Sequence, residues 1–129
     1  GMADGLMLGE LHLDRARALV AAGDLESART DIDLALGLAS EDPLIWLASA
    51  TLARRMDDLP RARKDIAEAY RRSPDDASVY LEIGNIAALG GDENGAKSAW
   101  SDAIRIGPNS TAAASARAAM KQFETAAKP

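Results

Sequence analysis

Side chains that could carry out catalysis are sparse in this sequence of 129 residues. There is one histidine, His12, and there is no cysteine. A metal site normally needs several histidine, cysteine or carboxylate ligands that converge, and a catalytic histidine needs partners of its own. We therefore expect no catalytic residue, no metal and no cofactor, and we predict that the chain is not an enzyme.

Two other patterns have a simpler explanation than a ligand site. Gly90-Gly91 lies between two predicted helices, with no strand before it and no GxxxxGK sequence, so a phosphate-binding loop is not indicated. The acidic pairs Asp57-Asp58 and Asp75-Asp76 stand at predicted helix starts, without the spacing of a calcium-binding EF-hand loop. A carboxylate at a helix start accepts hydrogen bonds from free backbone N–H groups, and we interpret both pairs as helix caps.

The composition favours packed helices. Hydrophobic residues make up 47% of the chain but aromatic residues only 4%, and many of the hydrophobic residues are alanines. Alanine is the best helix former, whereas strands favour aromatic and β-branched residues. No apolar run is long enough to span a membrane, and a net charge of −5 argues against general nucleic-acid binding. A cytoplasmic location is favoured, but Gly1-Met2 resembles a tag-cleavage scar, which leaves the natural N-terminus and any targeting signal open.

The sequence repeats itself at a fixed period without insertions. Residues at the same position of successive repeats are similar in type, and we call each such set a column. These columns are Ala28, Ala62 and Ala96; Ile32, Ile66 and Trp100; Ala35, Ala69 and Ala103; and His12, Trp46 and Tyr80. Each unit reads as two helices, because an aspartate before an apolar-periodic segment is a helix-start signal. The predicted helices span about 5–22, 25–39, 43–56, 59–72, 76–89, 92–106 and 110–126. We expect Gly23 and Gly107 to end helices in the left-handed conformation.

These columns resemble the tetratricopeptide repeat (TPR) family, whose units are helix–turn–helix pairs of about 34 residues. The aromatic residue of the first helix corresponds to Trp46 and Tyr80, and the closing proline to Pro74 and Pro108. The first repeat departs most, since Ser40 stands where the family favours proline. The resemblance implies an all-α, right-handed solenoid of about seven helices in a single domain covering residues 1–129. Its three repeats would span about 9–42, 43–76 and 77–110, with a capping helix at about 110–126.

The resemblance also implies a protein-interaction module with a concave groove lined by the first helix of each repeat. By register, the groove residues would be Leu13, Arg17, Leu47, Thr51, Arg54, Arg55, Ser78, Leu81, Asn85 and Leu89. Three of these leucines share one column of the repeat and would form an apolar stripe beside the arginines. We therefore predict a peptide partner with apolar side chains and some acidic character. The competing interpretation is that the leucines are partly buried and the arginines merely solvated.

Some TPR domains bind C-termini of the EEVD type through a carboxylate clamp, and this chain lacks the clamp residues. The matching positions hold Leu13, Arg17, Ala48, Ser78 and Glu82 in place of the family's lysine, asparagine and arginine set. Recognition of an EEVD terminus is therefore not expected.

Two other functions remain open at this point. The chain could be an assembly or oligomerisation domain of a larger protein, and it could be a monomer or a weak homodimer. Residues 54–72 carry seven basic and four acidic side chains, which makes nucleic-acid binding a more distant alternative. We favour a simpler interpretation of that segment, an exposed helix with ion pairs such as Arg61–Asp65 and Lys64–Glu68.

Overall fold

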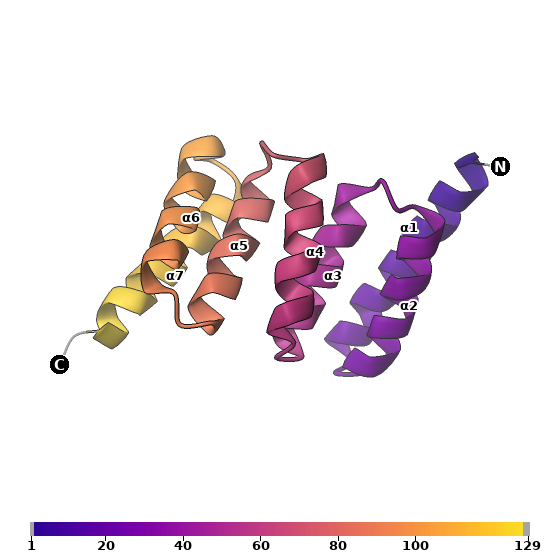
Figure 1. Cartoon of the computed structure of the whole chain (residues 1–129), viewed down its shortest axis with the longest axis horizontal. Helices are drawn as coiled ribbons and strands as arrows, with labels where there is room; N and C mark the ends of the chain where they lie inside the picture. The colour runs from indigo at the N-terminus through magenta and orange to yellow at the C-terminus, as the bar shows by residue number, and fades with distance from the viewer. Residues whose placement is uncertain (1, 128–129) are drawn as a thin grey trace. The chain divides into compact units, whose positions relative to one another are not determined.

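The computed structural model describes residues 2–127, which form seven α-helices and no strand. The helices are α1 (Met2–Ala21), α2 (Leu25–Leu38), α3 (Pro43–Arg55), α4 (Leu59–Arg72), α5 (Ala77–Leu89), α6 (Glu93–Ile106) and α7 (Thr111–Ala127) (Figure 1). The predicted all-α class is confirmed, and each predicted helix lies within a few residues of its observed bounds. The chain divides into two compact units, residues 1–72 and 73–129.

Aspartate side chains cap the N-termini of five of the described helices. Asp24, Asp42, Asp76 and Asp92 each accept a hydrogen bond from a backbone N–H in the first turn, at 2.9–3.1 Å. Asp58 does the same for α4, accepting from the backbone N–H of Arg61 at 3.2 Å. These bonds satisfy N–H groups that have no partner within the helix. The interpretation of the acidic pairs as helix caps is therefore confirmed for Asp58 and Asp76.

The turn inside each helix pair uses one left-handed residue at the same repeat position. Gly23 has φ +84° and Gly91 has φ +82°, while the middle pair places Asp57 there with φ +59°. Glycine and aspartate adopt this conformation more readily than other residues do. The predicted left-handed conformation is confirmed for Gly23. The same prediction is wrong for Gly107, which ends α6 with φ −133°. Its N–H still closes the helix by bonding to the Ala103 carbonyl at 3.1 Å.

Alanine columns let the helices of residues 1–72 approach one another closely. Ala16, Ala28, Ala35, Ala50, Ala62 and Ala69 are all fully buried, at 0% exposure. Leu13, Ile32, Ile45 and Leu52 fill the space between α1, α2 and α3. Small contact residues permit close helix packing, and the larger aliphatic side chains occupy the gaps that remain. This arrangement holds α1 and α3, the first helices of two successive helix pairs, close to the same core.

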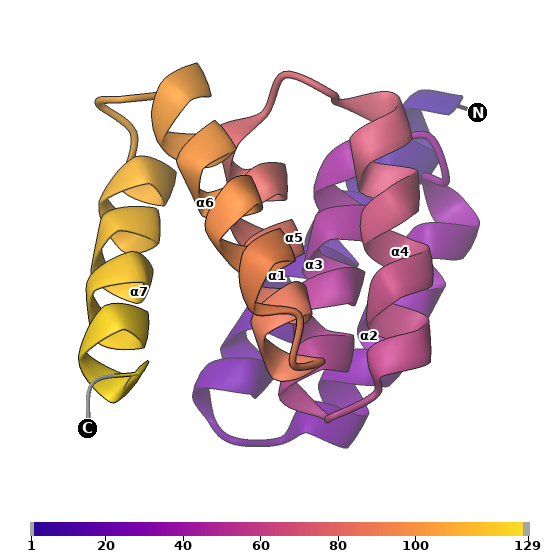
Figure 2. The same cartoon turned by 60° about the vertical axis from the view of Figure 1, so that its left-hand side comes forward.

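Trp100 is the centre of the second unit, residues 73–129. It is 3% exposed and packs with Ala96, Ala103 and Ala116, while Tyr80, Met120 and Phe123 surround this cluster. The Phe123 ring meets Trp100 edge-on, with centroids 5.7 Å apart. Helix α7 therefore packs against α5 and α6 through these side chains, and Figure 2 shows its ribbon beside that of α6.

Candidate functional site

Residues of α1, α2 and α3 line a mostly apolar, partly open pocket of about 300 Å³ within residues 1–72. Its size is at the lower end of the range for small-ligand pockets, which suits one or two inserted side chains. The lining residues from α1, α2 and α3 are Leu13, Ala16, Arg17, Val20, Ile32, Leu44, Leu47, Ala48, Thr51, Leu52 and Arg55. Five of the ten predicted groove residues, Leu13, Arg17, Leu47, Thr51 and Arg55, are thus brought together.

The leucines of this pocket differ in exposure. Leu13 is 2% exposed and belongs to the core, so it forms the floor of the pocket. Leu47 is half-buried, and Leu44, which the same pocket includes, is 46% exposed. Leu47 is therefore partly buried, as the competing interpretation has it, whereas Leu13 is fully buried and Leu44 is exposed.

Positive charge lies at the mouth of the pocket. Arg17 and Arg55 are both exposed and both line it. The Arg17 guanidinium lies 3.5 Å from the Asp14 carboxylate, and both side chains are more than half exposed. Such a surface pair is weak and can exchange partners. A carboxylate on a ligand that occupies the pocket would meet two guanidinium groups there.

The remaining predicted groove residues lie outside this pocket. Arg54 is on α3 but does not line it. Ser78, Leu81, Asn85 and Leu89 all lie on α5, in the second unit. Within that unit Leu81 packs against the Trp100 cluster, and Leu89 is 46% exposed. The Asn85 side-chain carbonyl accepts a hydrogen bond from Trp100 Nε1 at 3.1 Å, which fixes the orientation of the amide.

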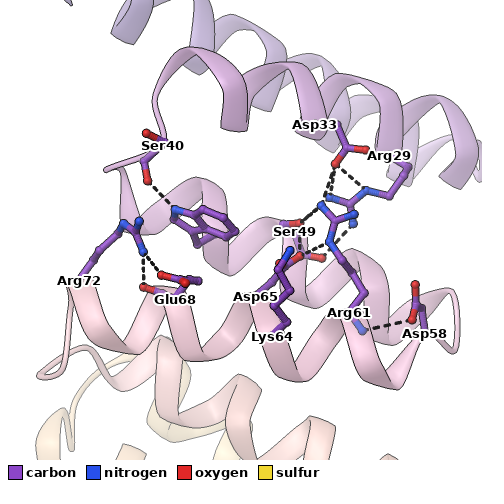
Figure 3. A network of polar contacts seen from close by, with 11 residues as sticks. Arg29, Asp33, Ser40, Ser49, Asp58, Arg61, Lys64, Asp65, Glu68 and Arg72 are labelled. Atoms are coloured by element: carbon purple, nitrogen blue, oxygen red, sulfur yellow. Dashed lines mark hydrogen bonds and ion pairs between the residues drawn. The ribbon is translucent and has the colours of Figure 1, made fainter.

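A buried polar network, which the sequence did not reveal, joins α2, α3 and α4 (Figure 3). Asp65 is 0% exposed and accepts from Ser49 Oγ at 2.5 Å and from Arg61 Nε at 2.7 Å. Arg29 from α2 donates to both the hydroxyl and the carbonyl oxygen of Ser49. Asp33 then links the two arginines, at 2.9 Å from each guanidinium. The network therefore connects the first helix pair to the second.

The ion pairs of α4 differ in part from those predicted. Arg61 does pair with Asp65, but Asp65 is buried instead of lying on an exposed face. The predicted Lys64–Glu68 pair is wrong: Lys64 Nζ lies 4.0 Å from Asp65 Oδ1, and Glu68 accepts from two other residues, Arg71 and Arg72. At least four of the seven basic side chains of residues 54–72 thus have a carboxylate partner, which weakens the case for a nucleic-acid-binding face.

The far end of α4 carries a second polar cluster, also visible in Figure 3. Arg72 donates to the Glu68 carboxylate at 2.5 Å, and its guanidinium carbon lies 4.9 Å from the centre of the Trp46 ring. Trp46 Nε1 donates to the Ser40 carbonyl at 2.6 Å. Trp46 thus links the α2–α3 connection to α4.

Two pKa values are shifted by these contacts. Burial tends to lower the pKa of Arg61, but hydrogen bonds to Asp65 and Asp33 outweigh it and raise that pKa above its ordinary value. Hydrogen bonds from Arg72 and Arg71 lower the pKa of Glu68 below its ordinary value of 4.5. Both shifts favour the charged forms, so the ion pairs of α4 persist at neutral pH.

His12 takes part in a structural cluster on the first helix pair. Its Nδ1 lies 3.2 Å from Asp31 Oδ1, and Arg15 Nε donates to the other oxygen of Asp31 at 2.8 Å. Asp31 is 1% exposed and occupies the same repeat position as Asp65. Among the residues that the structure describes, no group of three or more potential metal ligands comes together. Within the same range, no helix is long and apolar enough to cross a bilayer.

Comparison with known proteins identifies the fold. No protein-family model matches the chain, and no curated protein matches it significantly. Solved structures do match. The first TPR domain of Spaghetti (RPAP3), bound to the HSP90 peptide SRMEEVD, is 13% identical, with a TM-score of 0.81 over 94% of each chain.

Other TPR domains give similar values. The TPR domain of Arabidopsis OM64 has a TM-score of 0.80 and 14% identity over 92% of this chain and 98% of that chain. The Sgt2 TPR domain from Aspergillus fumigatus has a TM-score of 0.75 and 19% identity over 94% of this chain and 84% of that chain. At these identities the likeness concerns the fold, and it agrees with the repeat register of the sequence. The chain therefore has the fold of a tetratricopeptide-repeat domain.

Proposed function

We propose that this chain is a non-enzymatic protein-interaction module that binds a peptide segment in the α1–α3 pocket. The observation that carries this proposal is an open apolar pocket with two arginines, Arg17 and Arg55, among its lining residues. The ligand would insert one bulky apolar side chain and place a carboxylate beside the arginines. Two of the similar TPR structures are themselves complexes with peptides.

The chemistry of the pocket sets the expected strength of binding. Burial of one large apolar side chain contributes about 1.5–3 kcal/mol. Contacts to exposed arginines add less than about 1 kcal/mol each, because water screens them. These terms sum to at most about 5 kcal/mol, and the cost of immobilising a flexible peptide reduces that sum, so they support a dissociation constant in the millimolar range or weaker.

The mode of recognition would differ from that of an EEVD clamp. The complexes among the similar structures hold the peptides SRMEEVD and SGPTIEEVD. Here Leu13 and Ala48, which occupy two clamp positions, form apolar parts of the pocket, and Glu82 is 4% exposed. A leucine or an alanine cannot donate a hydrogen bond to a carboxylate, so we infer that the apolar side chain of the ligand contributes most of the affinity.

The other predicted groove residues are proposed as further contacts: Arg54 on α3, and four residues of α5 that belong to the second unit. Arg54 would supply further positive charge, and Leu89 an apolar contact. Asn85 would donate its amide N–H to the peptide backbone, since Trp100 already occupies its carbonyl oxygen. Ser78 and Leu81 complete this set.

A displayed library of random peptides tests the proposal directly. We expect selection on the immobilised chain to enrich peptides that carry an acidic residue within about two positions of a bulky apolar residue. Binding of one enriched peptide, labelled with a fluorophore, is then measured by fluorescence anisotropy. Leu47→Glu and Arg55→Glu should each weaken binding at least tenfold, because they place negative charge in the pocket and remove an apolar or a basic contact.

A matched control separates the pocket from the net charge. Arg63→Glu replaces an exposed arginine of α4 that lies outside the pocket. It changes the net charge by two units, as Arg55→Glu does, and should leave the affinity for the peptide unchanged. A peptide ending in EEVD should bind no better than its scrambled version. Enriched peptides that bind Leu47→Glu and Arg55→Glu as tightly as the unmodified chain would show that the pocket is not the site.

A further inference from the structure

An asparagine–glycine pair stands in the first turn of α6. Asn94 is exposed and precedes Gly95, and both follow Asp92, the residue that caps this helix. The chain has three asparagines, and only Asn94 is followed by glycine. The corresponding positions of the two earlier repeats hold Glu26-Ser27 and Pro60-Arg61, and neither pair carries a side-chain amide. The third helix pair therefore has a reactive group at this position that the other two lack.

The chemistry open to such a pair is the loss of the side-chain amide as ammonia. The backbone nitrogen of Gly95 attacks Asn94 Cγ, and a bond forms between these two atoms. The bond from Cγ to Nδ2 breaks, and ammonia leaves with the proton that the Gly95 nitrogen gave up. Water then opens the cyclic succinimide at either carbonyl, which yields aspartate or isoaspartate. Glycine favours the attack because it has no side chain to obstruct its nitrogen.

In the folded chain, the Asp92 carboxylate holds the nitrogen that would attack. The Gly95 N–H donates to Asp92 Oδ1 at 2.9 Å, and a Cβ at Gly95 would overlap that carboxylate, so the two groups lie in direct contact. The attack requires this nitrogen to lose its proton and to approach Asn94 Cγ. Ring closure also requires ψ of Asn94 to rotate away from the helical value of about −42°. The intact first turn therefore opposes the reaction in two ways.

The restraint on Gly95 is local. The first N–H groups of a helix have no acceptor within it, so only the Asp92 side chain holds the Gly95 N–H. The next N–H, that of Ala96, already bonds to the Asp92 carbonyl at 3.0 Å. Helix ends open at a small cost in free energy, and loss of an aspartate cap makes the open form about five times more populated. Opening of this one turn therefore suffices to release the nitrogen.

We propose that Asn94 is a site of deamidation and that the Asp92 cap sets its rate, by controlling how often the first turn of α6 opens. The carboxylate acts as a restraint on the Gly95 nitrogen and not as a base that activates it. The reaction needs only water as a co-reactant. It takes place in the second unit and does not depend on the proposed peptide pocket of the first.

The two products would affect α6 differently. Aspartate leaves the backbone unchanged and adds a negative charge near the helix N-terminus, where such a charge is favourable. Isoaspartate adds one methylene to the backbone just before Ala96, which is 0% exposed. The cap could then not keep its register with the buried face that contains Ala96 and Trp100. Isoaspartate at this position is therefore expected to remove the first turn, whereas aspartate retains it.

Peptide mapping by mass spectrometry, after timed incubation of the full chain in mildly alkaline buffer, tests the proposal. In concentrated urea, Asn94 should react faster than Asn85 and Asn109, because only Asn94 precedes glycine. In the folded chain, Asn94 should react at least about tenfold more slowly than in urea, since the open turn is a minor form. Asp92→Ala should raise the rate in the folded chain about fivefold and leave the rate in urea unchanged.

Two matched variants separate the cap from other effects. Asp92→Ser keeps a capping oxygen but has no carboxylate, so its rate should stay near that of the unmodified chain. Asp76→Ala removes the equivalent cap of α5 in the same unit and should leave the rate at Asn94 unchanged. Equal acceleration by Asp76→Ala and Asp92→Ala would overturn the proposal, because unfolding of the whole unit would then set the rate. A slower reaction in Asp92→Ala would also overturn it, because the carboxylate would then act as a base.

Discussion

Replacement of Gly84 by alanine sets two effects of opposite sign against each other. Gly84 lies in the middle of α5, where alanine favours the helix by about 1 kcal/mol relative to glycine. Against this gain, a Cβ at Gly84 would overlap the Trp100 ring, with Cδ1, Nε1 and Cε2 as its nearest atoms. The side chain that must give way is a rigid indole, not the flexible end of a long residue.

The surroundings of Trp100 decide which effect is larger. The ring is 3% exposed, the Phe123 ring meets it edge-on, and its Nε1 is bonded to Asn85. Overpacking at such a site costs about 1–3 kcal/mol, and loss of the Asn85 bond costs about 1 kcal/mol more. After subtraction of the helix gain, we expect Gly84→Ala to lower the free energy of unfolding by about 2 kcal/mol.

Urea denaturation, followed by Trp100 fluorescence in a Trp46→Phe background, measures this change. Gly37→Ala is the matched control, because Gly37 lies in α2 with nothing within 4 Å of its added Cβ. It should raise stability by up to about 1 kcal/mol. In a Trp100→Leu background, which opens the space, Gly84→Ala should also become neutral or stabilising; unfolding of these chains is followed by circular dichroism, because Trp100 is absent. A Gly84→Ala chain as stable as the Gly37→Ala chain would refute the proposed contact with Trp100.

Two further predictions concern the charged groups of α4. Asp65→Ala leaves Ser49 and Arg61 without their buried acceptor, although Asp33 still binds the guanidinium. We expect urea denaturation to show a free energy of unfolding lower by about 2–4 kcal/mol. A decrease below about 1 kcal/mol would contradict the importance of the network. Because the pKa of Glu68 is lowered in the folded chain, its contribution to stability is present above about pH 4.5 and is lost as the pH falls through the folded value. Glu68→Gln should therefore lose less stability between pH 7 and pH 3 than the unmodified chain, and an equal loss in both would show that the arginine contacts do not stabilise the fold.

The helices were predictable from the sequence because each depends on local or periodic signals. The alanine columns, such as Ala28, Ala62 and Ala96, show the face that each second helix buries, and aspartates show where helices begin. The left-handed turn residue was recognised at Gly23 but not at Asp57, where a side chain occupies the same conformation. Periodicity thus identifies the helices, but it does not identify a turn in which a residue other than glycine adopts the left-handed conformation.

The pocket was predictable only in part, and the polar network was not. Register placed Leu13, Leu47 and Arg55 on first helices, but only the structure shows that Leu13 is the floor and Leu47 a wall. Asp65 looked like one half of an exposed pair within α4, because its partner Ser49 lies on another helix. The repetition of aspartate at positions 31 and 65, one residue before Ile32 and Ile66, was the signal that could have indicated burial.

Because the polar network joins the first two helix pairs, the first pair cannot be replaced by another helix pair of the chain without loss of its contacts. If a duplication replaced α1–α2 with a copy of α5–α6, Lys97 would take the register position of Arg29, and Ser101 that of Asp33. A lysine cannot reproduce the forked donation of Arg29 to Ser49, and a serine cannot balance the charge of an arginine. The junction would then bury polar groups whose partners are missing. Evolution or engineering that shuffles these repeat blocks must therefore carry the residues of a junction together, because the helix pair alone is not the exchangeable module.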